Sequence, residues 1–545
     1  MFALRCLSPC HPADHRACGH LRLASGLYPV ARRSGDRVLH RRAVCHDPAD
    51  QDLLVGPAGC QPGNQRALDH HDRDRRRGRD HGIADQQAGQ PAPAAGRAGR
   101  GPRHRMTRIH HAGAYAPLTG CYWQDSVAAP DWPVLEGCHR TEVAIIGGGF
   151  TGLSAAYHLA RDGVGVTVLE AEAPGWGASG RNGGFCCLGG AKASDRALRN
   201  RFGEDERRAY RRAERAAVDL VDGLLQDLDL EVDRHSEGET LLAHRRRDAD
   251  GFTDEIAAIE ADYDVTPHVL RKEELAQHGL NGPFHGALTV PVGFGLNPRK
   301  YLFGLAEAAQ AAGAHLHAHS AVTGMTRTGR RTQLHTANGT VTADTVIIAT
   351  NGYSHEDLPP WMAARTMPMQ SSVMVTRPLT RNEMAAQGWI SAQMAYDTRN
   401  LLHYFRLMPN GRFLFGMRGG LRATPGAEAR ARAALRRDFD AMFPAWAHVE
   451  ATHTWSGLVC LTRDLTPYIG PVPDLPGVFA GFAYHGNGVA MGSYAGALLA
   501  DLVQGKTPDT PYPAPLRTPP ARFPLGRLRL WLMQPAYWAF ALRDL

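Results

Sequence analysis

The chain has 545 residues, of which 43% are hydrophobic, 21% charged and 8% aromatic. This composition supports two or three domains with apolar cores and argues against wholesale disorder or a fibrous repeat. No run of roughly eighteen residues is apolar and uncharged, so no membrane-spanning helix is predicted. The formal charge of +7 raises the question of an anionic partner.

The positive excess is confined to residues 1–105, which contain 18 Arg and 10 Asp but no Lys and no Glu. Residues 106–545 then carry 43 basic and 44 acidic side chains, so no nucleic-acid partner is predicted. Residues 1–105 also contain one Phe, one Tyr and no Trp, too few large apolar side chains for a core. We interpret them as a non-native or disordered leader, the translation of GC-rich DNA in an unused frame, with Met106 as the start.

Two alternatives for this segment are a His/Cys metal module and an Arg-rich nucleic-acid arm. The run Asp72–Asp80 alternates acid with Arg and largely neutralises itself, which disfavours the arm. A secretory signal is not predicted, because no apolar core follows Met1. The metal candidates follow no paired ligand spacing, so no metal site is predicted; they are Cys6, Cys10, His11, His15, Cys18 and His20.

A nucleotide-binding pattern follows a polar and aromatic leader at 106–140. Val143–Ile146 is an apolar run typical of a buried parallel strand, and it continues into Gly147–Gly152, a G-x-G-x-x-G motif. The helical run Leu153–Arg161 and a second strand, Gly165–Leu169, come next. This context favours a dinucleotide site over an ordinary glycine-rich turn.

Each residue type in the motif has a physical role. Gly147 permits the tight turn, Gly149 admits the pyrophosphate, and Gly152 lets helix and strand pack closely. The helix N-terminus offers amides to the phosphates, and Glu170 would accept hydrogen bonds from ribose hydroxyls. The motif by itself permits NAD or FAD. The cofactor-binding residues predicted here are Gly147, Gly149, Phe150, Thr151, Gly152 and Glu170.

The segment after Glu170 favours FAD. Gly175–Phe185 is too rich in glycine for a crossover helix. At this point the chain resembles the glycine/D-amino-acid oxidase family of flavoproteins, and most closely its γ-glutamylputrescine oxidoreductase-like branch. That branch carries a GASGRNGG segment, matched by Gly177–Gly184. The resemblance implies non-covalent FAD, with this segment along the pyrophosphate and flavin ring through Ser179, Arg181, Asn182, Gly183 and Gly184.

The resemblance extends over roughly residues 115–545. It includes a Pro-initiated helix after Leu296, a strand at Ala314–His319, a turn after the strand Thr345–Ala349, and the block Trp455–Gly470. It also includes a helix opened by Gly481–Val489, whose amides face the flavin's pyrimidine edge in the family. The further cofactor residues implied are Val322, Thr350, Asn351, Gly352, Gly486, Asn487, Gly488 and Val489.

The expected fold is α/β (α+β), with a Rossmann-like FAD-binding domain of the two-dinucleotide-fold type and a mixed-sheet substrate domain. The FAD-binding domain is predicted from 141–235, 291–355 and 454–510, and the substrate domain from 236–290 and 356–453. A tail at 511–545 should fold back as a helix, with interfacial membrane contact as the alternative.

The resemblance implies hydride transfer from a carbon next to nitrogen to the flavin, hydrolysis of the imine, and reoxidation of the flavin by oxygen. The expected substrate is a small-molecule amine in the cytoplasm, and no strong general base is needed. Asn400–Phe415 is predicted to form two strands, with Tyr404 and Arg406 on one face and His403 and Phe405 on the other. The candidate catalytic residues are Tyr404, Arg406 and His485.

One departure from the family concerns the substrate. Relatives that oxidise amino acids often carry Arg-Pro where this chain has Val459 and Cys460, and that Arg binds the substrate carboxylate. A γ-glutamylputrescine-like amine is therefore preferred. Because Arg463 or Arg406 could substitute, oxidation of D-amino acids, glycine or sarcosine stays open. An NAD-linked dehydrogenase and a nucleic-acid-modifying flavoprotein are the alternatives from other classes.

The interpretation of residues 1–105 is testable. A chain beginning at Met106 should be soluble and bind FAD as well as the full chain, because the deleted residues lack the apolar side chains that would offset chain entropy. Flavin absorbance and limited proteolysis of both chains measure this. A protease-resistant 1–105 fragment, or loss of flavin on its removal, would contradict the interpretation.

Overall fold

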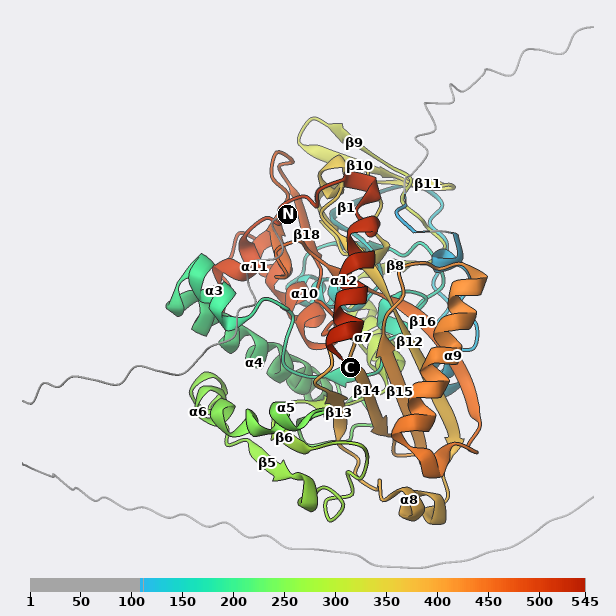
Figure 1. Ribbon diagram of the computed structural model, residues 1–545. Coiled ribbons are helices and arrows are strands. Elements are labelled where there is room, and N and C mark those ends of the chain that lie inside the picture. Colours follow the sequence, from blue (N-terminus) through green and yellow to red (C-terminus); the bar gives the residue numbers. More distant parts are fainter. Residues whose placement is uncertain (1–107, 111, 545) are drawn as a thin grey trace, which may run out of the picture. The chain divides into compact units, whose positions relative to one another are not determined.

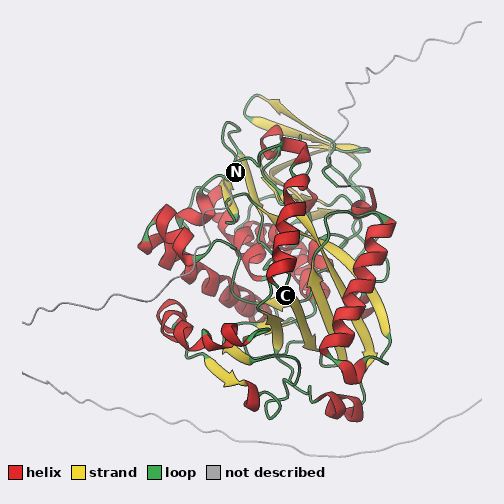
Figure 2. Ribbon diagram, viewed as in Figure 1, coloured by secondary structure: helices red, strands yellow, loops and turns green. Residues whose placement is uncertain are grey.

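The computed structural model describes residues 108–110 and 112–544. The interpretation of residues 1–105, with its metal and nucleic-acid alternatives, thus lies outside the described residues. The described residues belong to one compact unit, Arg97–Leu545, which has a mixed α/β architecture as predicted. They form two eight-stranded sheets with helices packed around them (Figures 1 and 2), and a two-stranded sheet of β3 (Phe185–Cys186) and β7 (Phe294–Gly295).

The first sheet is the predicted dinucleotide-binding fold. Its order is β17-β18-β11-β1-β2-β8, with β10 and β9 added beside β11. The pairs of β1 with β11 and β2, of β2 with β8, and of β11 with β18 are parallel. The strands are β1 Gly137–Ile146, β2 Val166–Leu169, β8 His315–His317, β9 Gly324–Thr328, β10 Arg331–His335, β11 Gly339–Ile348, β17 Tyr468–Pro471 and β18 Val478–Phe482.

Helices cover this sheet where its central strands β1 and β2 are buried. All four residues of β2 and the last four of β1 are buried, as expected for parallel strands with both faces covered. Helix α2 (Phe150–Arg161) packs against α10 (Ala490–Val503) and α7 (Pro298–Ala311). Helix α7 begins with Pro298 as predicted, whereas α2 begins at Phe150, three residues before the predicted start.

The second sheet is the predicted mixed sheet, in the order β16-β12-β15-β14-β13-β4-β6-β5. Strand β16 pairs antiparallel with β12, so the predicted domain boundary at residue 454 falls inside a strand and residues 454–461 lie in this sheet. The strands are β4 Glu239–Leu242, β5 His268–Arg271, β6 Gly286–Val290, β12 Met367–Pro378, β13 Met394–Asp397, β14 His403–Leu407, β15 Arg412–Arg418 and β16 Ala451–Leu461.

One face of the second sheet packs against α9 (Pro425–Met442), which lies along β12 and β15 (Figure 1). Phe405 of β14 and Phe415 of β15 stack on this face and meet Phe443 just after α9. Because side chains alternate along a strand, the residues next to these in sequence point to the opposite face of the sheet. His403 and Phe405 point to the α9 side, as the period of two predicts.

The C-terminal helix α12 folds back onto the body. The buried guanidinium of Arg529 forms an ion pair with Glu356, and the Asp544 carboxylate accepts hydrogen bonds from the Asn400 and Leu401 amides at 2.8 and 2.9 Å. No helix of residues 108–544 combines the length and hydropathy needed to cross a bilayer. The remaining helices are α1 Tyr122–Ser126, α3 Asp195–Phe202, α4 Glu204–Asp227, α5 Arg246–Asp250, α6 Phe252–Tyr263, α8 Arg381–Gln387, α11 Ala514–Arg517 and α12 Leu530–Arg543.

Candidate functional site

One pocket runs from the β1–α2 turn to the face of the second sheet that α9 does not cover. Three predicted cofactor residues, Gly152, Gly184 and Gly352, are absent from its lining and pack behind it. The predicted residues that line it are Gly147, Gly149, Phe150, Thr151, Glu170, Ser179, Arg181, Asn182, Gly183, Val322, Thr350, Asn351, Gly486, Asn487, Gly488 and Val489, together with Tyr404 and His485.

The β1–α2 turn requires its glycines. Gly147 has φ of +109°, and a Cβ there would lie 2.8 Å from the Ala349 carbonyl oxygen. A Cβ on Gly152 would lie 2.0 Å from the Gly147 oxygen, so this glycine serves close packing. A Cβ on Gly149 would meet the Ser179 hydroxyl at 2.8 Å. These close contacts leave no room for side chains at the glycines, so the backbone of the turn itself forms part of the pocket wall.

Glu170 stabilises the same turn. Its carboxylate accepts hydrogen bonds from the Gly148 amide at 2.8 Å and the Glu172 amide at 3.0 Å. Burial raises the pKa of Glu170, and these amides oppose that shift. A carboxylate has about four lone-pair positions, so acceptor capacity is left for ribose hydroxyls. Glu170 therefore positions the turn as well as facing the predicted ribose site.

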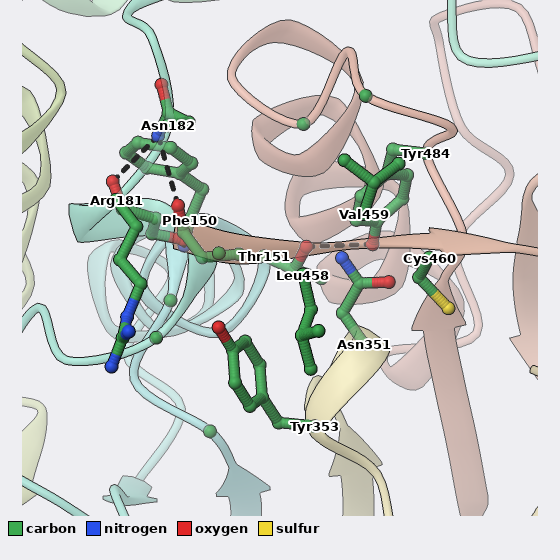
Figure 3. A pocket seen from close by; sticks show the side chains of 18 of the residues that line it. Phe150, Thr151, Arg181, Asn182, Asn351, Tyr353, Leu458, Val459, Cys460 and Tyr484 are labelled. Carbon is green, nitrogen blue, oxygen red and sulfur yellow. Dashed lines mark hydrogen bonds between the residues drawn. The ribbon is translucent and has the colours of Figure 1, made fainter. Parts of the chain in front are cut away.

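The loop Gly177–Gly184 is held from several sides. Trp455 of β16 and Trp123 of α1 donate indole hydrogen bonds to the carbonyls of Arg181 and Asn182 at 2.7 and 2.8 Å. The Asn182 side chain donates to the Ser179 carbonyl at 2.8 Å and accepts from the Gly184 amide at 2.8 Å. Figure 3 shows Arg181 and Asn182 on this loop beside Phe150.

Arg181 provides a test of whether the site suits a dinucleotide. Its guanidinium donates to the carbonyls of Trp176 and Ser456 at 2.6 and 3.2 Å, yet its buried Nη2 has no hydrogen-bond partner among the described residues. Because Arg181 lines the pocket, this unmet donor suits a phosphate oxygen. Together with the glycine turn, the residues fit FAD.

The far side of the pocket is tied to the dinucleotide fold. The Asn351 side chain accepts a hydrogen bond from the Ala483 amide at 2.9 Å, which joins the turn after β11 to the segment before α10. Thr151 and Tyr484 share a hydrogen bond of 2.8 Å (Figure 3). The Thr151 hydroxyl and the Asn351 side-chain oxygen therefore each have one partner within the protein, and both side chains keep further hydrogen-bonding capacity for a ligand.

Tyr404 faces the pocket as predicted. Its ring lies over Gly416, where a Cβ would come within 2.2 Å of it, and its hydroxyl bonds with the Ser371 hydroxyl at 2.9 Å. The ring also meets Phe185 edge-to-face at 5.7 Å. Tyr404 thus forms a fixed wall of the pocket beside the loop Gly177–Gly184.

His485 lines the pocket, but its ring nitrogens bond to backbone. Nδ1–H donates to the Gly190 carbonyl at 2.7 Å, and Nε2 accepts from the Thr462 amide at 3.3 Å. Burial lowers the pKa of His485 to about 3, so the ring is neutral at neutral pH. His485 is therefore better suited to positioning the surrounding loops than to transferring a proton.

Arg406 does not line the pocket, in contrast to the sequence-based expectation. Its guanidinium donates to His235 Nε2 and to the Leu296 carbonyl, both at 2.8 Å, and burial lowers its pKa to about 9. Tyr404 and Arg406 do share a face of β14, but the segment around Leu296 covers that face at Arg406. Arg463 is exposed, bonds to the Arg522 carbonyl, and also does not line the pocket.

Sequence reasoning missed several polar residues that line the pocket, among them Lys192, Glu239, Tyr396 and Arg418. Arg418 ends β15, three residues beyond the predicted end of that strand, which is why it was overlooked. Lys192, one of the chain's four lysines, directly follows the glycine-rich loops and gave a signal that went unused. Glu239 and Tyr396 come from neighbouring strands that only the sheet brings together.

Glu239 is a buried acid on the pocket wall, with 6% of its surface exposed. Burial raises its pKa to about 8, while interactions with the Cys187 thiol and the Tyr396 phenol act in the opposite direction. The carboxyl is therefore largely protonated at neutral pH. It offers a hydrogen-bond donor to the pocket in place of a full negative charge.

Substitution of the dinucleotide site should reduce FAD binding. Glu170→Ala is expected to weaken it by roughly 1–3 kcal/mol, the range for a lost hydrogen bond to a charged group, and Gly149→Val should abolish FAD retention. Titration of apoprotein with FAD measures both. Glu142→Ala is the matched control, because Glu142 also accepts a backbone hydrogen bond, from Gly165 at 2.8 Å, but lies away from the pocket. Unchanged affinity in both site variants would contradict this assignment.

Glu239 should make stability fall with rising pH. Its pKa in the folded protein is about 8 against an ordinary 4.5, so folding favours the neutral acid and stability is lost progressively between these values. Glu239→Gln should remove that loss and raise the Tm at pH 8.5 relative to the unsubstituted chain, with little change at pH 4. Thermal unfolding across this range measures it. Glu237→Gln, at an exposed position two residues away, is the control; identical profiles for all three proteins would refute the inference.

Comparison with known proteins agrees with this site. The family model "FAD dependent oxidoreductase" (DAO) matches residues 142–502. The Rhizobium meliloti protein named "Probable oxidoreductase OrdL" is 33% identical over 419 residues, covering 76% of this chain and 95% of that protein. The Escherichia coli γ-glutamylputrescine oxidoreductase is 28% identical over 367 residues, covering 67% and 84%.

A solved structure shows the same fold. Glycine oxidase from Geobacillus kaustophilus superimposes with a TM-score of 0.56 at 22% identity, covering 70% of this chain and 98% of that structure. The family match spans both the dinucleotide fold and the second sheet, and it includes the glycine turn and the loop Gly177–Gly184. The chain therefore belongs to the DAO family of FAD-dependent oxidoreductases.

Proposed function

We propose that this enzyme oxidises a C–N bond of a small amine of the γ-glutamylputrescine type, with FAD bound non-covalently. One observation carries the proposal: a single pocket joins the dinucleotide turn to the polar face of the second sheet, and Val459 lines it where amino-acid-oxidising relatives often have Arg. Similarity to the Escherichia coli γ-glutamylputrescine oxidoreductase supports the substrate type. Bound FAD would supply the hydride acceptor.

The protein's own residues would hold the amine and limit water. Tyr404 is fixed by Gly416 and by its hydrogen bond to Ser371, so it gives the substrate a rigid wall. Leu458 and Val459 add apolar surface to the lining. Such surface suits a neutral amine, the form from which hydride leaves, better than an ammonium ion.

The substrate class follows from where the charges lie. Val459 offers no cation to a carboxylate on the reacting carbon, so an amine whose carboxylate is remote is preferred. A glycine or D-amino-acid substrate is the second candidate, because Arg418 lines the same pocket and could meet an α-carboxylate.

A cytoplasmic location suits the five cysteines of the described part, which are all free.

Anaerobic mixing of the holoenzyme with an amine panel tests the proposal. γ-Glutamylputrescine should bleach the flavin faster than glycine, sarcosine or D-alanine, because only its carboxylate lies far from the reacting carbon. Bleaching should accelerate as pH rises through the amine's pKa, since the neutral amine reacts. Faster bleaching by glycine or D-alanine would favour the second candidate and reject the preferred substrate class.

A further inference from the structure

Two cationic side chains face the pocket without a carboxylate partner. Arg418, at the end of β15, and Lys192, in the loop after β3 (Phe185–Cys186), both line it. Arg418 Nη2 donates to the His485 carbonyl at 3.2 Å, which leaves most of its five N–H donors available. Within residues 108–544, neither side chain has a carboxylate oxygen within 4.0 Å.

Hydrogen bonds bring the segments of the two cations together: Arg418 Nη2 donates to the His485 carbonyl, and the His485 ring donates to the Gly190 carbonyl, two residues before Lys192. The charge of Arg418 is the largest cause that lowers the pKa of Lys192, to about 7, and Lys192 is itself solvent-exposed where it lines the pocket. Glu239 shares the pocket, but with its pKa raised to about 8 it supplies little negative charge at neutral pH. Like charges held together in this way are stabilised when an anion binds between them.

The surroundings of Arg418 are ordered and rich in hydroxyl groups. Ser371 of β12 is its partner in the β12–β15 register, and the Ser371 hydroxyl is bonded to the Tyr404 hydroxyl at 2.9 Å. Tyr537 of α12 lies beside the next residue, at 3.8 Å from the Cβ position of Gly419. The sheet therefore fixes the backbone of Arg418, the docked C-terminal helix flanks it, and the guanidinium is held by its hydrogen bond to the His485 carbonyl.

We propose that Arg418 and Lys192 form a carboxylate-binding subsite, and that in the preferred γ-glutamylputrescine-type substrate the carboxylate it receives is the one remote from the C–N bond being oxidised. This inference rests on the proposed amine oxidation and names the residues that would select the substrate. A guanidinium can bind a carboxylate in bidentate fashion, and the neighbouring ammonium adds a second charge-assisted contact. Arg418 thus takes the role for which the sequence suggested Arg406 or Arg463.

Two amines with the same reacting end test the subsite. γ-Glutamylputrescine carries the remote carboxylate and N-acetylputrescine lacks it. Arg418→Met and Lys192→Met should each raise the KM for γ-glutamylputrescine roughly ten- to hundred-fold, with a small effect on kcat and on N-acetylputrescine. Arg418→Lys should recover part of the loss. Arg463→Met, which removes an exposed Arg outside the pocket, is the matched control and should behave as the unsubstituted enzyme.

A binding measurement separates the subsite from turnover. Glutarate, a dicarboxylate without an amine, should perturb the flavin spectrum of the oxidised holoenzyme, and both Met variants should lose this binding while retaining FAD. Equal losses with both amines, or an unchanged KM for γ-glutamylputrescine, would overturn the subsite. If no amine bleaches the flavin, the proposed function fails, but glutarate binding by the unsubstituted enzyme and its loss in the variants still support the subsite; absence of glutarate binding would reject it.

Discussion

The loop Gly177–Gly184 is the element on which the pocket depends, because hydrogen bonds from distant parts of the chain converge on it. Trp455 and Ser456 of β16 contact Arg181, and Trp123 of α1 contacts Asn182. These hydrogen bonds hold the glycine-rich segment in one conformation, although such a segment has high conformational entropy when it is free. That conformation joins the dinucleotide turn to the second sheet and makes the two halves of the site continuous.

The two arginines near the site, Arg406 and Arg418, differ in whether a neighbouring segment covers them. Arg406 lies beneath the segment around Leu296 and donates to two neutral acceptors, so it stabilises the junction between β14 and that segment. Arg418 lies on the adjacent strand with its side chain in the pocket lining, and most of its donors stay open to the pocket. Two arginines on neighbouring strands therefore have different roles, because burial by a neighbouring loop decides which one meets a ligand.

Much of the dinucleotide site was predictable because its signals are local. The glycine turn, the buried strand before it and the acid after the second strand lie within a short stretch, and backbone geometry links each residue type to its place. The alternation that set Tyr404 apart from Phe405 was equally local. The prediction placed Trp455 in the FAD-binding domain, whereas its strand pairs with β12 of the second sheet, because the pairing partners of a strand are not encoded in its own sequence.

The sequence by itself determined the dinucleotide turn, the glycine-rich loop and the family, since each depends on residue types at fixed spacing. Only the tertiary structure decided which polar residues face the substrate end of the pocket. The order of strands in the second sheet brings Glu239 and Arg418, which are far apart in the chain, to one cavity, and the loop after β3 adds Lys192. The same packing places the His485 ring in hydrogen bonds to backbone groups and covers Arg406. Contacts between elements, and not the sequence of any one element, decide which polar groups a fold leaves accessible to a ligand.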